Sequence, residues 1–479
     1  MASWRLAPRR PRTKWVRPSR GHRQRPPTRL ALEALENRCL LDGIPILPNL
    51  PPTFLSASTV PPNGDVNPYG VAFVPNGFPQ GGPLHVGDVL VSNFNNHKNL
   101  QGTGTTIVDI SPAGKQTLFF KGPSTPGALG LTTALGVLKA GFVIVGSVPT
   151  LDGTSNTIQA PGSLLILNSQ GKAVMSLSSS AFLDGPWDLT INDQGGKAQV
   201  FVSNVLSGTV TRLDLLIPAD GNPVIAGETQ IASGYLIRPD PAALVVGPTG
   251  LAYDAAKDLL YVASTGDNAV FVVAGAQGRS TDAGKGTVVY SDPKHLHGPL
   301  ALTLTPNGDL ITSNGDAVNP DPEQPSELVE FTPKGQFVAE LSVDAAPGSA
   351  FGLALESSPS QIHFAAVDDN LNTLDIWTIN LTGDPGRMPG PQSRPVIPGP
   401  QGNGSVRGVS PASPDGGVVR GEGRIDTMAA APDPAVLDQL FAATARATSP
   451  LSFTGHNPRA RHGAEDGNLD VFAAATSDD

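Results

Sequence analysis

The sequence predicts an all-β protein, a six-bladed β-propeller of four-stranded blades with disordered extensions at both ends. Three observations lead to this prediction: a composition rich in turn-forming residues, a unit of alternating apolar strands that recurs along the chain, and small residues in the first strand of most units. Gly (54) and Pro (47) exceed a fifth of the 479 residues, whereas charged residues make up only 15%. Frequent turns and sparse charge favour short strands over long amphipathic helices.

Residues 1–43 form a basic head. Ten of the 32 Lys and Arg residues lie between Arg5 and Arg29, where no acidic residue occurs. Blocks of like charge are usually disordered, and we expect the same here. The remaining 22 basic residues face 42 Asp and Glu, a net charge of −20. An acidic body lacks the basic footprint of a nucleic-acid-binding protein, so we predict no nucleic-acid partner for the propeller.

The stretch LALEALENRCLLDG, Leu30 to Gly43, lacks the uninterrupted apolar region of a standard signal peptide. An Arg/Pro-rich head followed by LEALENRCLL resembles the LEPR-XLL segment, a sorting-type motif of bacterial cell-surface and secreted proteins. The resemblance rests on Leu35, Glu36, Arg38, Leu40 and Leu41, and Asn37 stands where the motif has Pro. It implies an extracytoplasmic destination. No apolar run approaches the roughly 18 residues of a membrane span, and we expect residues 44–51 to be a linker.

The body consists of six similar units. Each begins with a small or Pro-containing lead-in and an alternating apolar strand, followed by two or three further strands. Five lead-ins are clear: NPYGVAFVPNG from Asn67, GPWDLTINDQGG from Gly185, GPTGLAYDAAKD from Gly247, GPLALTLTPNGD from Gly298 and SAFGLALESSPS from Ser349. A weaker unit starts near Leu129. Intervals of roughly 50 to 60 residues are near the spacing of propeller blades.

The first strands carry small residues because inner strands converge on a narrow axis, as at Gly70, Gly250 and Gly352. The sixth unit stops near Asn380 without an outer strand. The stretch PTFLSASTV, Pro52 to Val60, precedes the first unit and is predicted to supply the missing strand. Such closure hides strand edges that could otherwise pair with other chains. The propeller is therefore expected to span residues 52–381.

The blades resemble those of NHL-repeat and gluconolactonase-like propellers. The turn LTLTPNG, Leu302 to Gly308, and the stretch YVASTGDNAV, Tyr261 to Val270, carry the resemblance. These are scaffold motifs, which recur across unrelated functions. Beyond the body, residues 382–479 are Pro/Gly-rich and predicted to be disordered, with a possible short helix near residues 434–446.

Polar side chains are expected around one mouth of the central channel. The loops entering the inner strands and those leaving the second strands open on the same face. These loops contain Asn67, Asp188 and His297 in the first set, and Asn93, Asn204, Asp267, Asn314 and Asp368 in the second. Such an oxygen-rich ring could bind Ca²⁺, with Asp188 and Asp267 supplying negative charge and the others forming a ligand-binding rim. Asn and Asp are equally the residues that turns require, so turn chemistry is the alternative.

Two functions remain open. The lactonase-like relatives hold a divalent ion with Glu, Asn and Asp, whereas this chain has NPYG at the first lead-in and GPTG and GPLA at later ones. The sequence also lacks a G-x-S-x-G elbow, a P-loop and an H-E-x-x-H motif, and we assign no catalytic residue. We therefore predict a non-enzymatic, monomeric, secreted or cell-surface propeller that binds a protein or glycan through its loop-rich channel face. The alternative is a metal-dependent lactone or ester hydrolase of the gluconolactonase type.

Overall fold

The computed structural model describes residues 44–179, 181–315, 327–345 and 350–381. The predictions for the basic head, the sorting segment and the helix near residues 434–446 lie outside the described residues. Among the residues described, no helix is long and apolar enough to cross a membrane.

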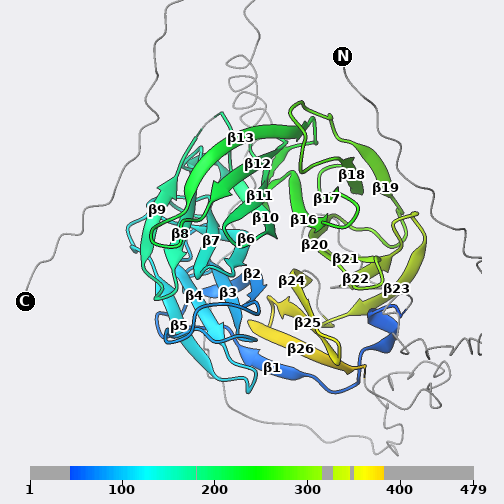
Figure 1. Cartoon of the computed structure of the whole chain (residues 1–479), viewed down its shortest axis with the longest axis horizontal. Helices are drawn as coiled ribbons and strands as arrows, with labels where there is room; N and C mark the ends of the chain where they lie inside the picture. Colours follow the sequence, from blue (N-terminus) through cyan, green and yellow to red (C-terminus); the bar gives the residue numbers. More distant parts are fainter. Residues whose placement is uncertain (1–43, 180, 316–326, 346–349, 382–479) are drawn as a thin grey trace, which may run out of the picture. The chain divides into compact units, whose positions relative to one another are not determined.

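Six four-stranded antiparallel sheets surround a central axis, which confirms the predicted fold class (Figure 1). Blades 1 to 3 comprise β2 (Val66–Phe73), β3 (Val89–Asn95), β4 (Thr106–Ile110) and β5 (Gln116–Lys121); β6 (Leu131–Leu138), β7 (Phe142–Ser147), β8 (Ser163–Asn168) and β9 (Ala173–Leu177); and β10 (Pro186–Asp193), β11 (Lys197–Asn204), β12 (Thr209–Leu216) and β13 (Val224–Ser233). Blades 4 to 6 comprise β16 (Pro248–Asp254), β17 (Leu259–Ser264), β18 (Ala269–Ala274) and β19 (Thr287–Tyr290); β20 (Pro299–Leu304), β21 (Leu310–Asn314), β22 (Glu327–Phe331) and β23 (Phe337–Ser342); and β24 (Ala350–Ser357), β25 (Gln361–Asp368), β26 (Thr373–Asn380) and β1 (Leu55–Ser58).

The ring closes through β1, as the sequence predicts. This strand pairs antiparallel with β26, from Leu55 opposite Ile376 to Ser58 opposite Thr373. The ring of Phe54 packs 4.9 Å from that of Trp377, measured between centroids. Because the first and last strands share one sheet, blade 6 is complete only when both ends of the body are in place.

A short segment, residues 44–54, precedes β1, and we call it the strap. The 3₁₀-helix η1 (Leu47–Asn49) lies beside β23 in blade 5 (Figure 1). The backbone N–H groups of Ile46 and Leu47 each donate to the Glu330 carboxylate, at 2.8 Å. Glu330 is fully buried, and burial raises its pKa to about 7. Strap and β1 therefore join blades 5 and 6.

The inner strands approach one another closely near the axis. A Cβ on Gly352 would lie 1.8 Å from the carbonyl oxygen of Tyr69, and one on Gly250 would lie 2.5 Å from the backbone of Ala301. Only glycine fits at such distances. The small residues of the inner strands thus reflect contact between neighbouring blades.

Serines of the second strands tie neighbouring inner strands together. The Ser92 hydroxyl accepts from the N–H of Gly70 in its own blade and donates to the carbonyl of Thr132 in the next. The same pair of bonds recurs at Ser203, with Asp188 and Thr249, and at Ser313, with Ala301 and Phe351. These buried bonds fix the spacing of the channel wall.

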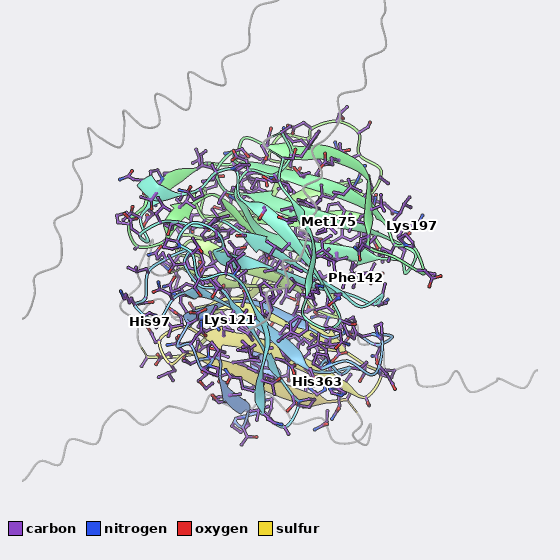
Figure 2. The ribbon with its side chains drawn as sticks, turned by 90° about the vertical axis from the view of Figure 1, so that its left-hand side faces the viewer. His97, Lys121, Phe142, Met175, Lys197 and His363 are labelled. Atoms are coloured by element: carbon purple, nitrogen blue, oxygen red, sulfur yellow. The ribbon has the colours of Figure 1, made fainter. Side chains whose placement is uncertain are left out.

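The propeller has two faces, which we name by the ends of the inner strands. We call the face where the inner strands begin the lid face, and the face where they end the open face. Seen from the side, His97 in the β3–β4 loop and Lys197 at the start of β11 lie at opposite edges of the ring (Figure 2). Apolar clusters fill the space between blades, such as Ile107 and Phe120 of blade 1 with Val143 of blade 2.

Candidate functional site: the central channel

The central channel is a cavity of about 240 Å³ between the six inner strands. Polar side chains on its wall are Asp188, Thr133, Thr190, Thr303 and Tyr253; the other lining residues are mainly Val, Leu and Ala, but the surface that faces the cavity is mostly polar. The wall becomes more exposed toward the ends of the inner strands: Asp188 is buried, whereas Thr190 and Tyr253 are half-buried. The cavity is therefore reached from the open face.

An aromatic plug closes the other end of the channel. The ring of Tyr69 lies 4.7 Å from that of Phe351 and 5.1 Å from that of Phe94. Trp187 meets Tyr69 and Phe94 edge-on, at 6.0 and 5.4 Å. All four side chains belong to one buried apolar cluster. Among the described residues, this plug lies between the channel and the lid face.

A hairpin forms a lid over this plug. Its strands β14 (Arg238–Asp240) and β15 (Leu244–Val246) come from the connection between blades 3 and 4. The Gln101 amide of blade 1 donates to the carbonyl of Ala242 across the mouth, at 3.1 Å. Leu244 is buried in the plug cluster with φ of 62°. A branched residue in this left-handed region is strained, so packing holds the lid in place.

Asp188 lies in the wall of the channel, directly after the plug residue Trp187. The sequence suggested a loop, but Asp188 is a strand residue in β10. The same correction applies to the predicted site residues that lie within or at the ends of β2, β3, β11, β21 and β25, namely Asn67, Asn93, Asn204, Asn314 and Asp368. The Oδ1 of Asp188 accepts from the N–H of Leu189 at 2.8 Å, and its Oδ2 accepts from that of Leu251 at 2.9 Å. Burial raises the pKa of Asp188 well above its usual value, and the two backbone donors only partly oppose this shift. The channel thus holds one desolvated acidic group.

Asn204 and Asn314 act as clamps on the loops that enter their own blades. The Asn204 amide donates to the carbonyl of Phe182 and accepts from the N–H of Asp184, at 3.2 and 3.1 Å. The Asn314 amide does the same with His295 and His297, both at 2.9 Å. Both asparagines are buried. These bonds join residues 17 to 22 positions apart, so they differ from the local turn bonds that the sequence offered as the alternative to ligand binding.

The other predicted residues lie against different partners. Asp267 forms an ion pair with Lys285 at 2.7 Å and accepts from the Ser264 hydroxyl and the Leu236 N–H. The buried Asn93 amide donates to the carbonyl of Thr59. Asn67 has φ of 61° and lines a cavity of about 40 Å³ under the lid.

Asp368 and His297 complete the predicted set. The Asp368 carboxylate accepts from the N–H of Leu371, and burial raises its pKa. The His297 ring nitrogen Nε2 lies 3.2 Å from the carbonyl of Lys294. No group of three or more His, Cys, Asp or Glu side chains within the described ranges could hold a metal ion. Calcium binding by Asp188 with Asp267 stays a prediction, and within the described ranges the two carboxylates contact different hydrogen-bond partners.

The sequence did not point to Thr133 or to the lid. Thr133 lines the channel, and its hydroxyl oxygen is buried without a hydrogen-bond partner among the described residues. It sits in the unit with the weakest lead-in, so alignment of the repeats gave it no distinct position. The lid could have been suspected from the length of one connection. About a dozen residues separate β13 from β16, and no other connection between blades is as long.

Two solved structures illustrate what this chain is similar to. A gluconolactonase from Xanthomonas campestris shares 13% identity, with 69% of this chain and 91% of that chain covered and a TM-score of 0.43. Regucalcin, a calcium-binding protein from Agrobacterium tumefaciens, shares 12% identity, with 68% and 95% covered and a TM-score of 0.41. At these values the likeness concerns the fold alone. No family model matches the chain, and no curated protein matches it by sequence.

Proposed function

We propose that this chain is a non-enzymatic binding propeller that contacts a protein or glycan through its lid face. The observation that supports this is the covered channel mouth: among the described residues, the aromatic plug and the β14–β15 lid lie over the lid-face end of the channel. Two of the candidate ring residues, Asn204 and Asn314, hold loops through both ends of their amides. A surface of this kind suits a macromolecule better than a small substrate that must be enclosed.

Exposed leucines occur on loops of this face. Leu236 and Leu371 are 56% and 66% exposed, and they follow strands that run toward the lid face. Leu216 and Val224, both 52% exposed, lie where β12 ends and β13 begins, on the open face. Both pairs are aliphatic and more than half exposed, so comparing them separates binding at one face from non-specific hydrophobic binding.

The test uses the full chain and a defined glycan panel, with binding measured by surface plasmon resonance. We expect the double change Leu236→Ser and Leu371→Ser to weaken any saturable binding at least tenfold, and Leu216→Ser with Val224→Ser to leave it unchanged. Equal losses in both variants, or no saturable binding to any glycan or candidate protein, would contradict the proposal.

A second candidate is a hydrolase of the gluconolactonase type, which one observation favours. Asp188 is a buried carboxylate of raised pKa in a cavity, a combination typical of acid–base groups. Hydrolysis of gluconolactone that requires a divalent ion and is lost in Asp188→Asn would establish this function. Metal-independent background rates in both proteins would exclude it for that substrate.

We further propose an extracytoplasmic location and a monomeric state. The location rests on the resemblance of Leu30 to Leu41 to the LEPR-XLL segment. We also propose that the blades are of the NHL-repeat type, on the basis of the repeat motifs alone. Fractionation of cells that express either the full chain or residues 44–479 tests the location. Loss of residues 1–43 should shift the protein to the cytoplasm. Light scattering of the purified chain tests the monomer.

A further inference from the structure

A groove lies at the seam where the ring closes. It has a volume of about 560 Å³ and is bounded by the strap and β1, by the edge of blade 1 and by strands β24 to β26 of blade 6. Phe54, Phe73, Glu356, His363 and Asn380 are among the residues that line it, and we call it the closure groove. Phe73 and Asn380 are the last residues of β2 and β26, so the closure groove belongs to the open face.

The surface of the closure groove is more apolar than polar. Phe54 is 47% exposed, and its ring packs against Trp377, 4.9 Å away between centroids. Phe73 is half-buried, and its ring lies 6.4 Å from that of His363, which Figure 2 labels. Exposed apolar side chains that gather beside polar groups are typical of an interaction site.

Glu356 supplies a carboxylate to the same groove. It lies opposite His363 in the β24–β25 pair and is half-buried. Among the described residues, its carboxylate forms no ion pair or hydrogen bond. Burial raises the pKa of Glu356, and His363 opposes that shift. A guanidinium beside the carboxylate would favour its ionised form further, because opposite charges lower the pKa of an acid.

The chain leaves the described body at the edge of this groove. Asn380 ends β26 and lines the groove, and the backbone N–H of Leu381 donates to the carbonyl of Ser360 at 2.8 Å. The point of departure is therefore fixed by β26 and by this bond. Four residues of chain span at most about 14 Å, so the sequence that starts at Pro385 lies within reach of the groove.

Residues 385–400 are suited to such a surface. They contain six Pro, the two cations Arg387 and Arg394, and no acidic residue. Proline-rich segments favour the extended polyproline II form, which binds aromatic-lined grooves and loses little entropy in doing so. The two arginines complement the carboxylate of Glu356, since a guanidinium can donate two hydrogen bonds to it.

We propose that residues 385–400 bind in the closure groove of their own chain, with prolines against Phe54 and Phe73 and an arginine at Glu356. A short connection gives the segment a high effective concentration at the groove, so a weak contact suffices. The bound segment covers the seam between the first and last strands of the ring. This contact lies on the open face and is separate from the lid-face surface of the proposed function.

The first experiment measures binding of a synthetic peptide of residues 385–400 by isothermal titration calorimetry. One sample is the natural full chain, and the other is the full chain with residues 385–400 replaced by an equally long Gly/Ser sequence. We expect saturable binding to the replaced chain and at least tenfold weaker binding to the natural chain, whose own segment occupies the groove. No saturable binding to the replaced chain, or equal binding to both, would overturn the proposal.

Two altered peptides isolate the recognition chemistry. Replacement of both arginines by Gln removes the charge and keeps the prolines, whereas replacement of all six prolines by Ser keeps the charge. Each should bind the replaced chain at least tenfold more weakly than the natural peptide does. Equal binding of the three peptides would contradict specific recognition.

Variants of the replaced chain locate the site. Glu356→Gln and Phe54→Ser should each weaken binding of the natural peptide at least fivefold. Glu228→Gln and Phe337→Ser are the matched controls, because Glu228 is also half-buried with a pKa raised by burial and Phe337 is 40% exposed. Losses in the controls equal to those in the groove variants would place the peptide elsewhere. Should Phe54→Ser fail to fold, as judged by circular dichroism, Glu356→Gln decides.

Limited digestion of the natural full chain with trypsin tests binding within one molecule. Cleavage after Arg387 should be at least tenfold slower than cleavage after Arg407, which follows the segment, and Glu356→Gln should remove this protection. Equal rates in the natural chain would overturn the proposal. Protection that increases with protein concentration would show that a second copy supplies the segment, which contradicts binding within one chain. The Leu236→Ser and Leu371→Ser variant should keep the protection, so failure of the lid-face function is distinguishable.

Discussion

Asp188 in the channel and Glu330 under the strap are both buried carboxylates that accept two backbone N–H groups. Their surroundings differ. Glu330 lies between β22 and the strap, fully buried, and its two donors come from residues more than 280 positions away. Asp188 is 8% exposed, and its donors come from the channel wall itself, beside a cavity.

This difference separates a structural acid from a candidate ligand-binding acid. Both side chains are desolvated, which raises the pKa of each, so the pKa alone does not distinguish their roles. What distinguishes them is the neighbouring space. Glu330 holds two distant segments together, whereas Asp188 faces a cavity in which a ligand or solvent can complete its hydrogen bonds.

The largest expected effect comes from removing the partners of Glu330. Deletion of residues 1–60 takes away the strap and β1, exposes β26 and leaves Glu330 without donors, so we expect loss of the cooperative thermal transition. Deletion of residues 1–43 keeps the strap and should leave the melting temperature almost unchanged. A cooperative, soluble 61–479 protein would show that closure does not depend on β1.

Alanine substitution compares the two carboxylates directly. Glu330→Ala leaves two buried N–H groups unsatisfied and should lower the free energy of unfolding by about 3 kcal/mol. Asp188→Ala should cost about 1 kcal/mol less, because solvent in the channel can reach the freed N–H of Leu251. Urea denaturation measures both values. Equal losses would mean that the cavity gives Asp188 no access to solvent.

The pH dependence of stability gives a finer distinction. The pKa of Glu330 is about 7 in the folded state, chiefly through burial with a contribution from Asp309, and near 4.5 when the chain unfolds. The folded state therefore binds this proton more tightly, and the contribution of Glu330 to stability falls as pH rises from about 5 to about 7, then levels off. Glu330→Gln cannot titrate, so its melting temperature should fall less than that of the wild type over this range. Parallel curves for the two proteins would argue against this assignment.

The smallest effect concerns the strained lid. Leu244 has a left-handed backbone, which glycine adopts without the penalty that alanine incurs. Both Leu244→Gly and Leu244→Ala lose the buried side chain, yet we expect Leu244→Gly to be more stable than Leu244→Ala by about 1 kcal/mol. The reverse order in thermal melts would show that the lid backbone is relaxed.

Fold class could be predicted from the sequence because a propeller repeats its local signals. Each unit carries its own turn residues and alternating strands, and the closing strand from Pro52 to Val60 follows from counting strands. Asn93, Asn204 and Asn314 could likewise be placed at equivalent positions of their units by aligning the repeats. Their role was not evident, because a polar side chain beside a turn has the same sequence signature whether it binds a ligand or holds a loop.

By itself, then, the sequence determined the number of blades, their four-stranded form and the closure of the ring, since these depend on periodicities that are local and repeated. Only the tertiary structure decided where the polar groups point. It put Asp188 and Thr133 into one cavity from different blades, closed the opposite mouth with Tyr69, Phe94, Trp187 and Phe351, and joined Glu330 to the strap. Each of these contacts links segments far apart in the chain. Their convergence depends on how blades pack around the axis, which no single repeat encodes.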